Sequence, residues 1–188
     1  EIIGIEETDV SRKHAELLPG FTKIALDNSK KTLNDIDAIA ISIGPGSFTG
    51  LRVGLGFAKG LAYSKGLPII PIPSMLSLAF SLQKYEPQQG ILHSHGDKVF
   101  FQTFSLKDKI PFTKQEPTLL NTNENAQALS KGFQFNCENI LSDLKGIKTA
   151  KPSSSNIGKL ASIYFDDFIV HKPYTLVPTY IAPFKTGK

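Results

Sequence analysis

The residues with the clearest potential for chemistry form a glycine-rich stretch between two apolar segments. Its members are Gly44, Pro45, Gly46, Ser47, Phe48, Thr49, Gly50, Leu51 and Arg52. A loop that joins a strand to a helix presents free backbone N–H groups, an arrangement that binds phosphate. However, Thr49 stands where the dinucleotide-binding pattern has its third glycine, and no lysine follows Gly50 as the P-loop requires. Ordinary turn chemistry explains the glycines equally well.

Other candidates for catalysis or metal binding are sparse. His93 and His95 could hold one edge of a metal ion, but no third ligand lies nearby in the sequence, and a polar turn is favoured. Ser47 has no recognisable base or orienting acid, which argues against a serine nucleophile. The single cysteine, Cys137, cannot form an internal disulfide and is expected to pack as a small apolar side chain. We therefore expect no catalytic residue and no metal site on this chain.

The composition indicates an ordinary folded protein. Of the 188 residues, 40% are hydrophobic, and the formal net charge is +4. Scattered lysines are typical of a solvated surface, although this charge is compatible with work near nucleic acid. The sequence contains no long uncharged apolar run and no charged-then-apolar leader. We therefore expect no transmembrane helix, no signal peptide and a cytoplasmic location.

Hydrophobic periodicity and turn residues predict an α/β protein with parallel strand pairing. Its first part is predicted as a strand at Glu1–Glu7, a helix that begins near Arg12 or Pro19, a strand at Ile36–Ile43, a helix at Gly50–Ser64, a strand at Ile69–Ile72 and a helix capped by Ser74. Its second part is predicted as a turn at His95–Asp97, a strand at Val99–Phe104, a turn at Lys107–Lys109, a helix at Asn123–Lys131, a strand at Ile140–Leu141, a helix at Asn156–Phe165 and an extended tail. The stretch Pro87–Gly90 suggests a boundary, so we expect one lobe at residues 1–86 and a smaller, degenerate second lobe at residues 87–188.

Three segments resemble the TsaB (YeaZ) family. Ser42–Ala62 closely resembles the signature segment of that family, His14–Pro19 its first-helix segment, and Leu67–Ser74 the strand that follows. The resemblance is specific through about residue 84 and loose beyond it. It implies a two-lobed fold of the actin and sugar-kinase (ASKHA, ribonuclease-H-like) type. In that fold a hairpin with one phosphate loop precedes the segment where this chain begins, so the first hairpin is expected to be missing.

The resemblance also implies a role and a set of partners. TsaB-type proteins lack activity of their own and pair with a larger catalytic paralogue, TsaD, in the complex that installs threonylcarbamoyl on tRNA adenosine beside the anticodon. A small ATPase, TsaE, also joins that complex. The resemblance thus implies contact with tRNA through the complex, a homodimer when the chain is alone, and no cofactor on this chain. ATP or ADP and the metal belong to the partners.

A comparison with the catalytic paralogue supports this expectation. In TsaD the strand that matches Ile69–Ile72 leads into a His-x-x-x-His pair that binds the catalytic metal. Histidines at that spacing share one helix face, as a metal ion needs. The corresponding residues here are Ser74 and Leu78, and a leucine cannot ligate a metal. The metal site of the paralogue is therefore expected to be absent.

The helix predicted over Gly50–Ser64 carries two apolar stripes, whereas a surface helix needs one. The first, which suits packing on the chain's own sheet, consists of Leu51, Leu55, Ala58 and Ala62. The second consists of Val53, Gly56, Phe57 and Gly60. Glycine costs up to about 1 kcal/mol relative to alanine within a helix, so two glycines in one stripe favour close approach of another helix. The alternative is that the preceding helix covers this stripe within the same chain. We predict a partner or dimer interface that consists of His14, Leu17, Phe21, Ile24, Val53, Gly56, Phe57 and Gly60.

Two other functions stay open. A stand-alone ATPase or small-molecule kinase of the same fold would need two phosphate loops and a carboxylate, whereas this sequence shows one glycine loop. The second alternative function is that of a self-associating protein whose homodimer is the functional form. Titration with ATP and magnesium tests the first, and co-purification with a TsaD-like protein tests the second.

Overall fold

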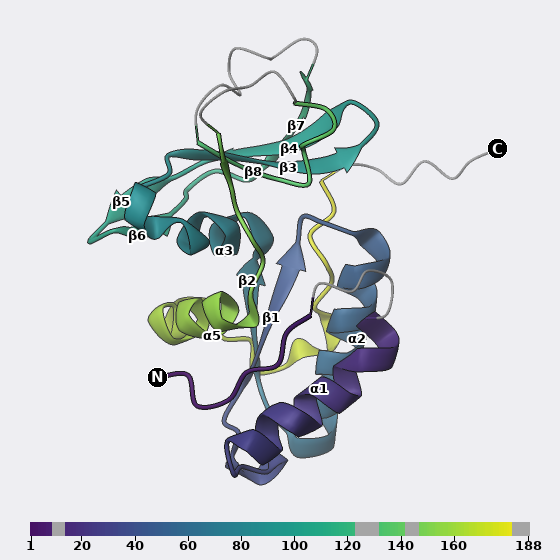
Figure 1. The fold of residues 1–188 in the computed structure, drawn as a ribbon. Coiled ribbons are helices and arrows are strands. Elements are labelled where there is room, and N and C mark those ends of the chain that lie inside the picture. The colour runs from purple at the N-terminus through teal and green to yellow at the C-terminus, as the bar shows by residue number, and fades with distance from the viewer. Residues whose placement is uncertain (9–13, 123–131, 142–146, 182–188) are drawn as a thin grey trace, which may run out of the picture. The chain divides into compact units, whose positions relative to one another are not determined.

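The computed structural model describes residues 1–8, 14–122, 132–141 and 147–181 (Figure 1). It contains two compact units. Unit 1 consists of Glu1–Ile43, Ser47–Pro73 and Ser153–Pro178, and unit 2 consists of Gly44–Gly46, Ser74–Pro152 and Thr179–Lys188. This division differs from the predicted lobes at 1–86 and 87–188, because residues 153–178 belong with the first part of the chain and residues 74–86 with the second.

Unit 1 combines a two-stranded sheet with helices. The strands are β1 (Ile39–Gly44) and β2 (Ile69–Pro73), and the helices are α1 (His14–Asn28), α2 (Phe48–Lys65), α5 (Ser154–Ile163) and α6 (Phe165–Phe168), with short 3₁₀ helices η1 (Leu33–Asp35) and η3 (Pro173–Thr175). The chain runs from β1 through α2 to β2, as the strand–helix–strand prediction requires. After α5, Val170 pairs with Ile69 and so returns the chain to β2.

Both ends of α2 follow from local sequence. Ser47 is the N-cap residue, and its side chain accepts a hydrogen bond from the Gly50 N–H. Gly66 ends the helix in the left-handed conformation at φ +65°, where its N–H donates to the carbonyl of Ala62. The predicted boundaries, Gly50 and Ser64, lie within two residues of the observed ones.

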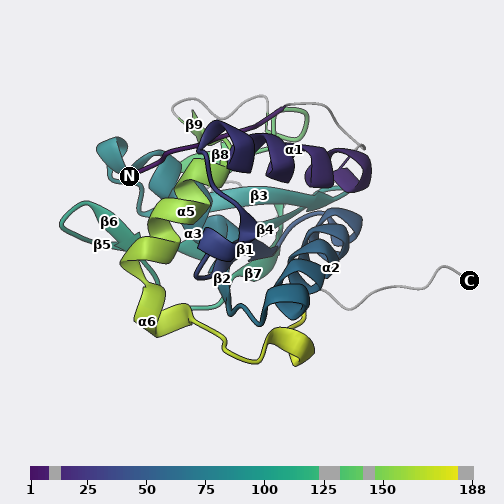
Figure 2. The ribbon, with the colours of Figure 1, turned by 90° about the horizontal axis from the view of Figure 1, so that it is seen from below.

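The core of unit 1 lies between α2 and the sheet. Ala58, Ala62 and Ile69 are buried there, and partly buried apolar side chains surround them: Ile39, Ile41, Leu67 and Leu176. Figure 1 and Figure 2 show α1 beside α2, and the two helices pack against each other. Helix α5 and α6 pack against β2.

The prediction of a strand at Glu1–Glu7 is wrong, since these residues form no strand ladder. They run instead against the helices of unit 1. A side chain at Gly4 would lie 2.5 Å from the carbonyl oxygen of Ala25 in α1, which shows how closely the backbones approach. Ile2 reaches Gly158 of α5. Alternation of apolar residues is necessary for a strand, but a strand also needs a neighbour with free hydrogen-bonding groups.

The carboxylate of Glu7 caps the N-terminus of α5. Its Oε1 accepts hydrogen bonds from the Ser153 hydroxyl at 2.9 Å and from the Ser154 hydroxyl at 2.6 Å, and the backbone N–H groups of Ser154 and Ser155 also donate to it. Partial burial opposes ionisation of Glu7, but these hydrogen bonds outweigh that effect and lower its pKa. The ionised carboxylate at a helix N-terminus therefore anchors the first residues of the chain.

This cap predicts a pH-dependent stability. Because the folded state lowers the pKa of Glu7, its contribution is present above the unfolded pKa of about 4.3 and is lost as the pH falls through the lower folded value. We expect Glu7→Gln to reduce the free energy of unfolding by about 0.5–1 kcal/mol at pH 7, since the group is largely exposed, and to have little effect near pH 3. Urea unfolding at both pH values measures this. Glu6→Gln is the matched control, and an equal loss in both variants at pH 7 would contradict the cap.

Unit 2 is built on a five-stranded sheet with the order β7-β4-β3-β8-β9 (Figure 1). Its elements are α3 (Ser74–Ser81), η2 (Gln83–Tyr85), β3 (Gln89–His95), β4 (Lys98–Thr103), β5 (Ser105–Lys107), β6 (Ile110–Phe112), β7 (Thr118–Asn121), β8 (Phe133–Phe135) and β9 (Lys148–Thr149). Strands β3, β4 and β7 pair antiparallel, whereas β3–β8 and β8–β9 pair parallel. Helix α3 packs against β3. The predicted turn at His95–Asp97 is the hairpin between β3 and β4, and Gly96 there has φ +55°.

The turn predicted at Lys107–Lys109 is also a hairpin, between β5 and β6. Asp108 and Lys109 both have positive φ, which matches the twist of the strands that they join. The predicted strand at Ile140–Leu141 is wrong. Ile140 ends a turn in which its N–H donates to the carbonyl of Cys137, Leu141 follows this turn, and both side chains pack onto the core. The helix predicted at Asn123–Lys131 lies outside the described residues.

The core of unit 2 confirms the interpretation of Cys137 as a small apolar side chain. It is fully buried beside Ile91 and Val99. Also in unit 2, the ring of Phe104, which follows β4, lies 5.9 Å from the ring of Phe133 of β8 between centroids. None of the helices in the described part of the chain is both long enough and apolar enough to cross a membrane.

Candidate functional site

The glycine-rich loop leads from β1 into α2. Gly44 closes β1 with φ +114°, a conformation that favours glycine. The hydroxyl of Ser47 accepts from the Gly50 N–H at 3.3 Å, and the carbonyl of Ser47 accepts from the Leu51 N–H at 2.9 Å. The Arg52 guanidinium lies 3.9 Å from the centroid of the Phe48 ring. Ser47 already accepts from the Gly50 N–H at the start of α2. This geometry therefore favours a structural turn, and not a phosphate-binding loop.

The second stripe of α2 leaves its glycines open. Gly56 and Gly60 are exposed, and a methyl group added at either position would meet no atom within 4 Å. Val53 and Phe57 on the same stripe are only partly buried. A helix from another molecule can therefore approach the α2 backbone at the glycines.

Helix α1 lies alongside this face and contributes the other predicted interface residues. Leu17 and Phe21 are half-buried, and Ile24 is 41% exposed. His14 is the first residue of α1, and its side chain lies outside the described structure. Helix α1 packs against α2, as the alternative of an intrachain cover requires. However, it leaves Gly56 and Gly60 open. We call these predicted interface residues of α1 and α2 the helical face.

The two positions that the family resemblance matches to metal-binding histidines of TsaD, Ser74 and Leu78, lie in α3. Ser74 is the first residue of α3, and Leu78 is buried in unit 2. The two histidines of the β3–β4 hairpin make local contacts: His93 Nε2 lies 3.1 Å from the Gly96 carbonyl, and His95 Nδ1 lies 3.0 Å from the Ser94 hydroxyl. Within the described ranges, no three His, Cys, Asp or Glu side chains gather as a metal ion would need.

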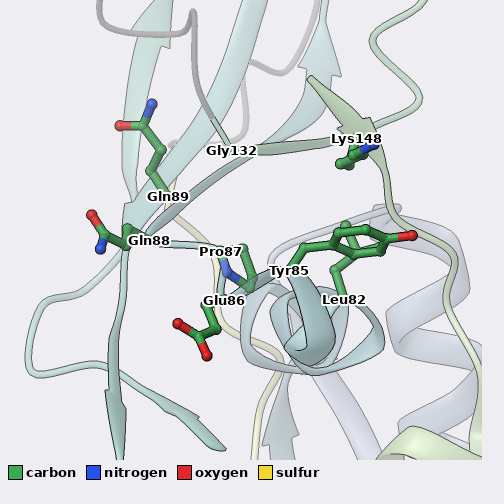
Figure 3. Close-up of a pocket in the computed structure, with 8 residues that line it drawn as sticks. All are labelled: Leu82, Tyr85, Glu86, Pro87, Gln88, Gln89, Gly132 and Lys148. Carbon is green, nitrogen blue, oxygen red and sulfur yellow. The ribbon is translucent and has the colours of Figure 1, made fainter. Parts of the chain in front are cut away.

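Unit 2 has an open pocket of about 420 Å³ that no sequence pattern indicates (Figure 3). It is lined by Leu82, Tyr85, Glu86, Pro87, Gln88, Gln89, Gly132 and Lys148. The Lys148 ammonium group lies 5.0 Å from the centroid of the exposed Tyr85 ring. Gly132 has φ +113°, and a side chain there would overlap the carbonyl of Gln89. In the sequence, the stretch Pro87–Gly90 indicates only a boundary.

Comparisons with known proteins agree with this geometry. A family model described as TsaD, tRNA N6-adenosine threonylcarbamoyltransferase, matches residues 2–97. The chain is 42% identical over 94 residues to the "tRNA threonylcarbamoyladenosine biosynthesis protein TsaB" of Haemophilus influenzae, which covers 48% of the chain and 39% of that protein. It is 45% identical over 69 residues to the tRNA N6-adenosine threonylcarbamoyltransferase of Clostridium botulinum, over 37% of the chain and 20% of that protein. The matches thus span well under two thirds of these relatives.

A solved structure from Pseudomonas aeruginosa, of an uncharacterized protein with similarity to peptidase YeaZ, superimposes with a TM-score of 0.76. It covers 93% of this chain and 87% of that chain at 20% identity. A second structure, YeaZ from the same organism, gives a TM-score of 0.73 at 19% identity. At these identities the likeness shows a shared mixed α/β fold. Since the family model matches just over half of the chain, and relatives named TsaB and YeaZ share its sequence and its fold, the chain belongs to the TsaB (YeaZ) family.

Proposed function

We propose that the chain is a non-catalytic scaffold subunit of the complex that installs threonylcarbamoyl on tRNA adenosine beside the anticodon. Its partners would be a TsaD-like catalytic paralogue, a TsaE-like ATPase and, through the complex, tRNA, in the cytoplasm. Its fold would be the two-lobed ASKHA type. ATP or ADP and the catalytic metal would be bound by the partners. Membership of the family and similarity to a TsaB of tRNA threonylcarbamoyladenosine biosynthesis support this assignment.

The observation that carries the proposal is the open stripe of α2. Gly56 and Gly60 expose helix backbone beside the half-buried Phe57, and α1 widens this surface with Ile24. Such a surface suits another helix pair of similar shape, because small residues allow close packing and the aromatic ring supplies buried area. In the absence of the paralogue, two copies of the chain would pair through the same surface about a two-fold axis.

Two features support a non-catalytic role. Leu78 is an apolar, buried side chain, at the position that the resemblance matches to a metal-binding histidine of TsaD. At the glycine loop, Ser47 caps α2 and thereby occupies the Gly50 N–H, which a nucleotide phosphate would otherwise use. This second feature also argues against the alternative of an ATPase or small-molecule kinase.

A reconstitution experiment tests the proposal. We expect the purified chain alone to leave tRNA unmodified in the presence of threonylcarbamoyl-adenylate. The same chain added to a TsaD-like protein, a TsaE-like protein, ATP and magnesium is expected to raise threonylcarbamoylation at least about 10-fold over the partners alone, as a required subunit does. Modification by the chain alone would overturn the non-catalytic role. Failure to co-purify with the TsaD-like protein, or to raise modification, would overturn the role as a partner.

A further inference from the structure

Two exposed tyrosines, neither of them among the residues of the helical face, lie together in unit 1. Tyr63 near the end of α2 is 75% exposed, and Tyr174 of η3 is 57% exposed. Their rings meet edge to face, with centroids 5.9 Å apart and an interplanar angle of 75°. Most of each ring faces solvent. Because a folded protein gains little by exposing two aromatic rings, this pair suggests a binding surface.

The pair is held in place by the elements that carry it. The Lys59 ammonium group, one helical turn before Tyr63, donates to the Tyr174 carbonyl at 2.9 Å. Pro173 is buried, and the Leu176 N–H donates to the Pro173 carbonyl, which fixes the turn of η3. The rings are therefore pre-organised, and a ligand would order little of the chain on binding.

Helix α2 and the residues that precede η3 are basic in sequence. The sequence contains no Asp or Glu between Asp37 and Glu86 or after Asp167, so neither α2 nor η3 carries a carboxylate. Arg52, Lys59 and Tyr63 follow one another at helical spacing on α2, and His171 and Lys172 precede η3. Within the described part of the chain, Lys59 and Lys172 form no ion pair with a carboxylate.

We propose that Tyr63 and Tyr174 form a platform on which unpaired bases of RNA stack, with Lys59 and Lys172 beside the phosphates. Aromatic faces next to lysines bind single-stranded nucleic acid, because every base offers a π-face and every nucleotide a negative charge. The chain has a formal net charge of +4. This charge favours a polyanion such as RNA as the ligand over a partner protein whose surface has few acidic residues. This proposal rests on the proposed function in one respect only, which is that the RNA is tRNA.

Fluorescence anisotropy with labelled, unmodified tRNA and with a short labelled oligouridine tests the platform on the full chain without partners. We expect Tyr63→Ala and Tyr174→Ala each to raise Kd for both probes by about 10-fold, while Tyr63→Phe and Tyr174→Phe stay within about 2-fold because the ring is kept. Lys172→Gln is expected to weaken binding and to reduce the slope of log K against log salt by about 1. Tyr85→Ala, which removes an exposed tyrosine of unit 2, is the matched control.

The outcomes separate this proposal from the proposed function. Equal RNA affinity of the native chain and both alanine variants, or no RNA binding by the native chain at low salt, would overturn the platform. Loss of pairing with a TsaD-like protein in the alanine variants, with RNA binding intact, would assign the tyrosines to a protein contact and also overturn it. Failure of the native chain to pair with the paralogue would count against the proposed function alone, because the RNA measurement uses the chain by itself.

Discussion

Gly60→Leu is expected to weaken pairing through the helical face strongly while stabilising the isolated chain. A side chain at Gly60 meets no atom within 4 Å, so the variant folds, and replacing a helical glycine with leucine adds up to about 1 kcal/mol to the free energy of unfolding. The same side chain would keep a facing helix from approaching the α2 backbone. We expect affinity for the TsaD-like partner to fall by about 100-fold or more, which is roughly 3 kcal/mol. Titration calorimetry and thermal unfolding measure the two effects.

Two further variants sharpen this test. Phe57→Ala is expected to weaken pairing by about 2–4 kcal/mol through lost burial, with a smaller effect on folding, because the ring is only partly buried in the chain itself. Lys107→Leu places a leucine at an exposed position on β5, outside the helical face, and serves as the control. Unchanged affinity in a folded Gly60→Leu protein would show that the interface lies on another face. Lost thermal stability in that variant would instead indicate that the chain itself covers this stripe.

Gly90→Ala is expected to destabilise unit 2 by about 3 kcal/mol. Gly90 of β3 pairs with Phe133 of β8, and a methyl group at Gly90 would overlap the Phe133 ring. That ring is only 1% exposed, so it cannot turn aside without disturbing the core, and overpacking of this kind costs 1–3 kcal/mol or more. Urea unfolding followed by circular dichroism measures the loss.

A double variant shows whether the Phe133 ring causes this loss. Phe133→Leu shortens the side chain and so relieves the overlap. The stability loss of the Gly90→Ala/Phe133→Leu protein should therefore be smaller than the sum of the losses of the two single variants by at least about 1 kcal/mol. Gly20→Ala in α1, where no atom lies within 4 Å, is the control and should stabilise the chain by up to about 1 kcal/mol. Additive losses at Gly90 and Phe133 would assign the cost of Gly90→Ala to the backbone.

The elements that the sequence predicted well are those with strong local signals. Helix α2 was located to within two residues because Ser47 caps it and Gly66 ends it, and both devices act within one turn. The two hairpins of unit 2 were located by Gly96 and by the Lys107–Lys109 turn, for the same reason. Such signals depend on neighbours in sequence, which a single chain displays directly.

The elements that the sequence predicted poorly depend on contacts between distant residues. Glu1–Glu7 alternates like a strand, but its partners are Ala25 of α1 and the N-terminus of α5, more than 140 residues away in the case of Ser153. The division into two units could not be predicted, because α5 packs against β2 although residues 74–153 separate the two elements in the sequence. The helical face was predicted from two glycines and a phenylalanine, and its role stays a proposal. The Tyr63–Tyr174 contact joins residues 111 positions apart, so periodicity could not indicate it.

The burial of Cys137 has a practical consequence for these experiments. Desolvation raises the pKa of its thiol to about 11, and the sulfur donates to the Phe135 carbonyl at 3.3 Å. Alkylating reagents attack the thiolate, which is scarce at neutral pH and enclosed here. Since the sequence has one cysteine, a second one introduced at an exposed site such as Lys107 would react selectively. This chain is thus ready for site-specific fluorophores or spin labels without removal of its own thiol.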